Sequence, residues 1–139
     1  MKLNELIEKR LIASKKTDHN DIVGSLKIAE RFLERAKGNM RLQYYDIAFT
    51  LAYSVMFHTA RALLFKTGYK ERSHYALIEA LRQTCKDKEN QSFIDALDSY
   101  RLTRHAIQYK GELCSQTDAA RAIKDAQTFL THVKKQFRT

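Results

Sequence analysis

Hydrophobic residues recur every three or four positions along most of this chain, which is the spacing of a helix that buries one face. One stripe follows capping candidates at residues 17–20 and stops near Gly38, where a glycine suits the end of a helix. Another opens at Ser73 and stops before a polar run at 86–90. The remaining stripes predict helices over about residues 2–14, 41–67, 91–109 and 118–137.

The stripe over 41–67 is apolar around much of its circumference, so we expect a central helix that other helices surround. Its most apolar part, 47–57, is shorter than the roughly 20 residues of a membrane span, which predicts burial in a core and no membrane association. Gly68 ends this helix and Gly111 ends the next long one. The last helix has its candidate caps at 117–118.

Five or six amphipathic helices with short connections predict an all-α fold, an antiparallel up-and-down helical bundle. The absence of proline and the presence of only four glycines argue against a turn-rich β-sandwich or barrel. The length of 139 residues suits one domain over 1–139.

Charge and cysteine use restrict the setting of the protein. Lysine and arginine number 25 against 16 acidic residues, and the net charge of +9 favours anionic partners, nucleic acid first among them. Cys85 and Cys114 form no close pair, and the N-terminus lacks a long apolar core. We therefore expect reduced thiols, no signal peptide and a cytoplasmic location.

Familiar enzyme motifs are absent from the sequence. It has no GxGxxG, GxxxxGK[ST], HExxH or nucleophile elbow, and its five histidines have no metal-ligand spacing. The sequence therefore predicts neither a bound metal nor a cofactor.

One cluster of side chains within residues 100–109 has the chemistry of a phosphodiester site. On a helix, Arg101, Arg104, His105 and Gln108 share one broad face with Tyr109 at its edge. Guanidinium groups hold phosphate, and an imidazole exchanges protons with a ribose hydroxyl. The alternative is a solvated basic face.

Three further residues, at two places in the chain, are candidates for RNA or nucleotide binding. His58 could join a polar pocket on the central helix, or it could be a hydrogen-bonded core histidine. Ser73 and His74 open a helix whose first N–H groups could bind an anion, or they form an ordinary cap.

The segment from Ala48 to His74 resembles the HEPN domain (higher eukaryotes and prokaryotes nucleotide-binding), in particular small stand-alone prokaryotic members. The central helix carries A-Y-x-x-M-F-H-x-A-R-A-L-L over 52–64, then Gly68, then Ser73-His74. Arg104 and Tyr109 form R-x-x-x-x-Y, which is similar to the C-terminal motif of that family. The resemblance is strongest over about 30–137.

The resemblance implies a four- or five-helix bundle and a homodimer whose motif helices meet at a cleft. It also implies association with RNA or a nucleotide. Many such proteins are metal-independent endoribonucleases, including toxins paired with a minimal nucleotidyltransferase or another antitoxin.

The family motif places histidine four to six residues after arginine, and this sequence departs from it. Four residues separate Arg104 from Tyr109, and three separate Arg101 from His105. Three hypotheses follow: an RNA- or nucleotide-associated component of a toxin–antitoxin or stress-response system, an active endoribonuclease toxin, and an adaptor bundle for a protein partner. The sequence favours the first.

Overall fold

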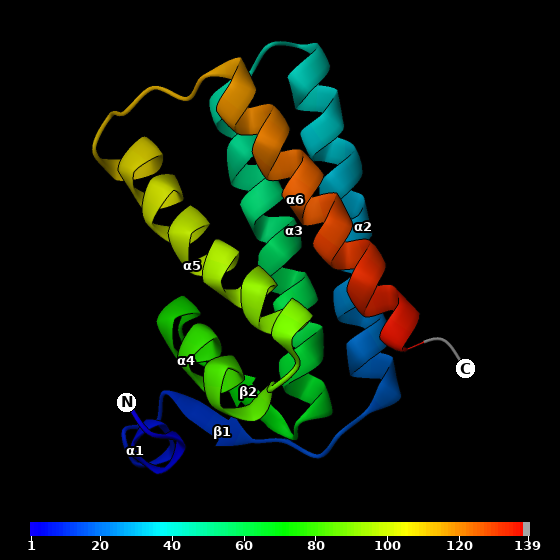
Figure 1. Ribbon diagram of the computed structural model, residues 1–139, viewed down its shortest axis with the longest axis vertical. Coiled ribbons are helices and arrows are strands. Elements are labelled where there is room, and N and C mark those ends of the chain that lie inside the picture. Colours follow the sequence, from blue (N-terminus) through cyan, green and yellow to red (C-terminus); the bar gives the residue numbers. More distant parts are fainter. Residues whose placement is uncertain (138–139) are drawn as a thin grey trace.

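The computed structural model describes residues 1–137, which form six helices and two short strands. The long helices are α2, α3, α5 and α6, and α1 and α4 are shorter (Figure 1). In chain order the elements are α1 (Leu3–Glu8), β1 (Ile12–Ser14), α2 (His19–Arg41), α3 (Tyr45–Lys66), β2 (Tyr69–Glu71), α4 (His74–Thr84), α5 (Lys88–Tyr109) and α6 (Gln116–Gln136).

The four long helices alternate in direction, so the predicted antiparallel helical bundle is confirmed (Figure 1). α3 packs against α2, α4, α5 and α6, and α6 also contacts α2. α4 crosses one end of the bundle, beside the β1–β2 ribbon and α1. α3 is therefore the central element, as its all-round apolar sequence predicted.

The core is built on α3. Phe49, Tyr53, Met56 and Leu64 of this helix are at most 2% exposed. By length and composition α3 could also cross a membrane, but 67% of its most apolar stretch is buried inside the fold. Burial among the other helices accounts for its apolar character.

Side-chain caps define where several helices begin. Ser73 Oγ accepts a hydrogen bond of 3.0 Å from Ala76 N, which confirms the predicted start of α4. Asp18 caps α2 in the same way, inside the predicted run. The predicted cap of α6 is wrong, because Ser115 accepts from Asp118 N at 3.1 Å and starts the helix at Gln116.

The first predicted helix, over 2–14, is wrong in its second half. α1 ends at Glu8, and Arg10 adopts a left-handed φ of 60°, which reverses the chain. Ile12–Ser14 then pairs antiparallel with Tyr69–Glu71. A hydrophobic stripe this short has no period that distinguishes a strand from a helical turn.

The predicted end of the second helix is also wrong. Gly38 lies inside α2, which continues to Arg41, and Gln43 makes the turn with a φ of 63°. α3 consequently begins at Tyr45. Gly68 and Gly111 have φ values of 91° and 71° and follow α3 and α5, as the sequence predicted.

Candidate functional site

Three side chains of α3 form a stripe on the side that faces α4 and α5. Tyr53, Phe57 and Arg61 are spaced four residues apart, so they lie above one another on the helix. α4 begins at His74, directly after its cap Ser73. This start brings the His74 ring against the stripe.

His74 is held by two aromatic rings. A hydrogen bond of 2.7 Å joins its Nδ1 to the Tyr53 hydroxyl, and the two rings lie 5.7 Å apart at 16°. On Phe57 the imidazole stacks more closely, at 4.1 Å and 21°. Nε2 has no hydrogen bond to any residue within 1–137 and reaches solvent, so it is available to a ligand.

A guanidinium group lies at each end of these stacked rings. The Arg104 guanidinium lies 4.8 Å from the centroid of the Tyr53 ring, and that of Arg61 lies 4.8 Å from the Phe57 ring. Contacts of this kind hold a cation over the face of the ring. We call Tyr53, Phe57, Arg61, His74 and Arg104 the His74 cluster.

The two arginines differ in their remaining partners. Arg61 donates two hydrogen bonds of 2.9 Å to the Glu71 carboxylate, so its charge is compensated. Arg104 donates one, of 3.0 Å, to the Gln108 side-chain oxygen. No carboxylate within the described residues pairs with Arg104, so this guanidinium keeps donors for an anion.

The cluster shifts the pKa values of its own groups. Burial lowers the pKa of His74, as do the nearby Arg104, Arg61 and Arg101 charges, while Glu71 opposes them. Burial raises the pKa of Tyr53 to about 12. At neutral pH the cluster therefore holds a neutral imidazole and a protonated phenol, beside fixed positive charges.

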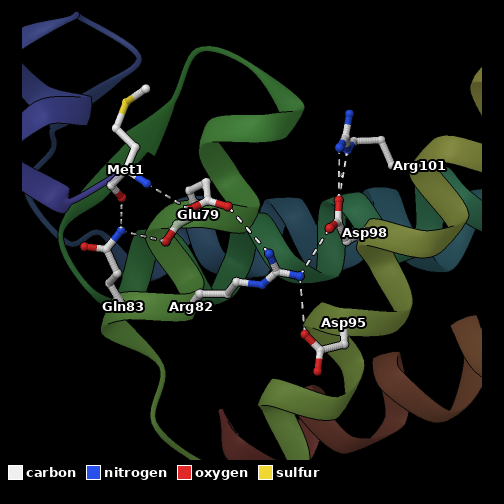
Figure 2. A network of polar contacts seen from close by, with 7 residues as sticks. All are labelled: Met1, Glu79, Arg82, Gln83, Asp95, Asp98 and Arg101. Carbon is white, nitrogen blue, oxygen red and sulfur yellow. Dashed lines mark hydrogen bonds and ion pairs between the residues drawn. The ribbon is translucent and has the colours of Figure 1, made fainter.

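Arg101 belongs to a neighbouring ionic network. Its Nη2 lies 3.0 Å from Asp98 Oδ1, and Asp98 Oδ2 lies 3.2 Å from Arg82 Nη2. Arg82 of α4 also contacts Asp95 and Glu79. Figure 2 shows Asp98 between the two arginines. This network ties α4 to α5 beside the cluster and compensates the charge of Arg101.

The HEPN domain family matches residues 23–136, most of the chain and all of the His74 cluster. The chain belongs to the HEPN family. A comparison with curated proteins gives no match. Within residues 1–137 no group of three or more His, Cys, Asp or Glu side chains could hold a metal ion.

In this HEPN protein the predicted site residues of α5 separate into two groups. Arg104 lies over Tyr53 and contacts Gln108, next to His74. His105 is exposed, and its ring lies 4.9 Å from Tyr109, which is 70% exposed. The structure thus brings His74 toward Arg104 and places His105 with Tyr109 on the solvent side of α5.

His58 lies at the edge of the stacked rings, on the side of α3 that faces α2. Its ring contacts Phe32 at 5.6 Å and the edge of Phe57 at 5.4 Å. Burial, and then the Arg61 charge, lowers its pKa to about 4. His58 is half-buried, and its Nδ1 is buried without a hydrogen-bond partner among residues 1–137, so the hydrogen bond of the core alternative is not formed. Ser73, the other neighbour of the cluster, uses its hydroxyl as the cap of α4.

The site residues predicted from the sequence did not include Tyr53, Phe57 or Arg61. The available signal was their four-residue spacing on one helix, together with a histidine at a capped helix start. That signal becomes specific only when α4 is known to cross α3 at this point.

Proposed function

We propose that this HEPN protein binds RNA or a nucleotide through a phosphate group at the His74 cluster. The observation that carries the proposal is the Arg104 guanidinium, held over Tyr53 without a carboxylate partner among residues 1–137, next to the neutral imidazole of His74. Arginine binds phosphate through paired, charge-assisted hydrogen bonds, and the Nε2 of His74 adds a further contact.

The charge of the chain supports the same proposal. A net charge of +9 attracts polyanions and raises their rate of encounter. The resemblance to small prokaryotic HEPN proteins suggests a cytoplasmic toxin–antitoxin or stress-response setting. In that setting the partners would be a second copy of the chain and a minimal nucleotidyltransferase or other antitoxin.

The test is RNA binding measured by fluorescence anisotropy at several salt concentrations. Arg104→Ala should weaken binding roughly tenfold and flatten the salt dependence, since this variant makes one phosphate contact fewer. Arg31→Ala is the matched control, because Arg31 is an exposed cation on α2 without an ion pair among residues 1–137. Equal effects of the two substitutions would sink the proposal.

An adaptor role gives a different result in the same titration. A hydrophobic contact with a protein partner is insensitive to salt, whereas phosphate contacts weaken steeply as salt rises. Wild-type protein that binds no RNA or nucleotide at low salt would leave the adaptor hypothesis as the better one.

A second candidate function is metal-independent RNA cleavage, favoured by the neutral imidazole beside Arg104. A neutral imidazole can accept the proton of a ribose 2′-hydroxyl, while arginine stabilises the charge that develops on the phosphate. Incubation with RNA in EDTA tests this candidate. Cleavage that His74→Ala abolishes and His105→Ala leaves unchanged supports it, and intact RNA with wild-type protein counts against it.

A further inference from the structure

A basic cleft lies on the far side of His74 from Arg104. It has a volume of about 310 Å³ and opens between α3, β2 and the start of α4. His74, Phe57 and Arg61 belong both to this cleft and to the His74 cluster, so the two are continuous. The cleft is lined by Phe57, Arg61, Lys70, Glu71, Arg72, Ser73 and His74.

The charges in the cleft do not cancel. The Glu71 side chain is only 4% exposed, and Arg61 pairs with both of its carboxylate oxygens. Lys70 and Arg72, on either side of Glu71, are exposed and have no carboxylate partner among residues 1–137. Three cations and one carboxylate therefore leave a net charge of +2 among the residues that line the cleft.

The wall that carries these charges depends on the N-terminal part of the chain. Arg72 N donates to Leu11 O at 2.8 Å, and Lys15 N donates to Gly68 O at 2.8 Å. Between these bonds β1 pairs with β2. β1 precedes residues 23–136, so a segment outside the HEPN match fixes one side of the cleft.

We infer that this cleft is a second phosphate subsite, and that the ligand is single-stranded RNA rather than a mononucleotide. The inference rests on the proposed function, because Arg104 and His74 supply the first phosphate contact. A mononucleotide offers its phosphate to only one of the two places. A strand that follows His74 from Arg104 to β2 places phosphates at both.

A single strand suits this site better than a duplex. The cleft is small, and the residue that directly follows His74 in the sequence, Tyr75, presents an aromatic ring that is 41% exposed. Unpaired bases can turn out from the backbone and stack on such a ring, whereas bases inside a duplex cannot.

The experiment compares two ligands, a labelled oligouridylate of about ten nucleotides and uridine monophosphate. The Lys70→Ala/Arg72→Ala variant should lose roughly tenfold or more in oligouridylate affinity, and the slope of log affinity against log salt should fall by about 0.7 for each phosphate that the variant no longer neutralises. Its affinity for uridine monophosphate should stay unchanged. Lys27→Ala/Arg31→Ala on the exposed side of α2 removes the same charge and is the control.

The outcomes separate the subsite from the proposed function. If Arg104→Ala weakens both ligands but the Lys70/Arg72 variant behaves like its control, the second subsite is wrong and the proposed function stands. If Arg104→Ala changes neither ligand, the proposed function fails. The single-strand inference is overturned if an RNA duplex of the same length binds as tightly as the oligouridylate. It is also overturned if polyglutamate displaces the labelled oligouridylate as well as unlabelled RNA does. Thermal unfolding checks that each variant is folded.

Discussion

Two histidines of this HEPN protein lie close to arginines in very different ways. His105 is next to Arg104 in the sequence, yet it lies on the exposed face of α5 with Tyr109. His74 is 30 positions away from Arg104, yet it lies between Tyr53 and Phe57, within reach of the Arg104 charge. Successive residues of a helix point about 100° apart, so the side chains of Arg104 and His105 diverge although they are neighbours in sequence. The packing of α4 on α3 instead brings His74 toward Arg104.

The surroundings of an imidazole therefore decide its pKa and its orientation more than its distance in sequence from an arginine does. Packing fixes the His74 ring and lowers its pKa, so that it is neutral when a ligand arrives. A ring on an exposed face keeps its rotational freedom, which must be given up on binding.

Removing the aromatic ring that supports His74 should lower the stability of the fold more than any other change considered below. Phe57 is 7% exposed and stacks on His74, so Phe57→Ala should lower the free energy of unfolding by about 3 kcal/mol. The corresponding support of His105 is Tyr109, which is 70% exposed, and Tyr109→Ala should cost less than about 0.5 kcal/mol. Urea unfolding measures both, and similar losses would contradict the contrast between the two regions.

A smaller effect is expected from pH. The pKa of His58 falls to about 4 in the folded chain from an ordinary value of 6.5, so between these values the unfolded chain binds the proton more strongly. Stability should therefore fall as pH falls through this window, by about 1 kcal/mol after allowance for the water around this half-buried ring.

The control for the pH effect is His58→Leu, which removes the titrating ring and keeps an apolar side chain. The stability of this variant should depend less on pH between 6.5 and about 4. His74, whose pKa is also lowered, accounts for a remaining slope of the same sign. An unchanged slope in His58→Leu would show that His58 does not contribute.

The smallest effect is expected from the hydroxyl of Tyr53. Tyr53→Phe keeps the ring under Arg104 and removes the 2.7 Å hydrogen bond to His74, which should cost about 0.5–1 kcal/mol of stability. The imidazole NMR signals of His74 should shift, because its Nδ1 loses its partner. Tyr44→Phe, at a ring that is 54% exposed, is the control and should change neither property. Unchanged His74 signals would contradict the assigned hydrogen bond.

Sequence predicted the parts of this molecule that depend on local pattern. The central helix follows from its apolar circumference, the start of α4 from Ser73, and the end of α3 from Gly68. The family resemblance rested on residues of α3 and α4 and is confirmed by the HEPN match.

Sequence could not predict the features that depend on packing between distant segments. The pairing of Ile12 with Glu71 joins two strands of three residues each, too short to have a readable period. The site around His74 forms only when α3, α4 and α5 pack against one another. The spacing of residues within α5 does not show how these helices pack. The α5 candidates rest on closeness in sequence alone.

The β1–β2 ribbon also has a consequence for the order in which the protein folds. Helices form from contacts close in sequence, whereas this ribbon must close a loop between residues 12–14 and 69–71, so it is expected to form late. Two strands of three residues hold few hydrogen bonds, and such an element opens more easily than the helical core. The basic cleft is therefore expected to be completed after the helical bundle and to open before it, and its opening would also take the Glu71 carboxylate away from Arg61 of the His74 cluster.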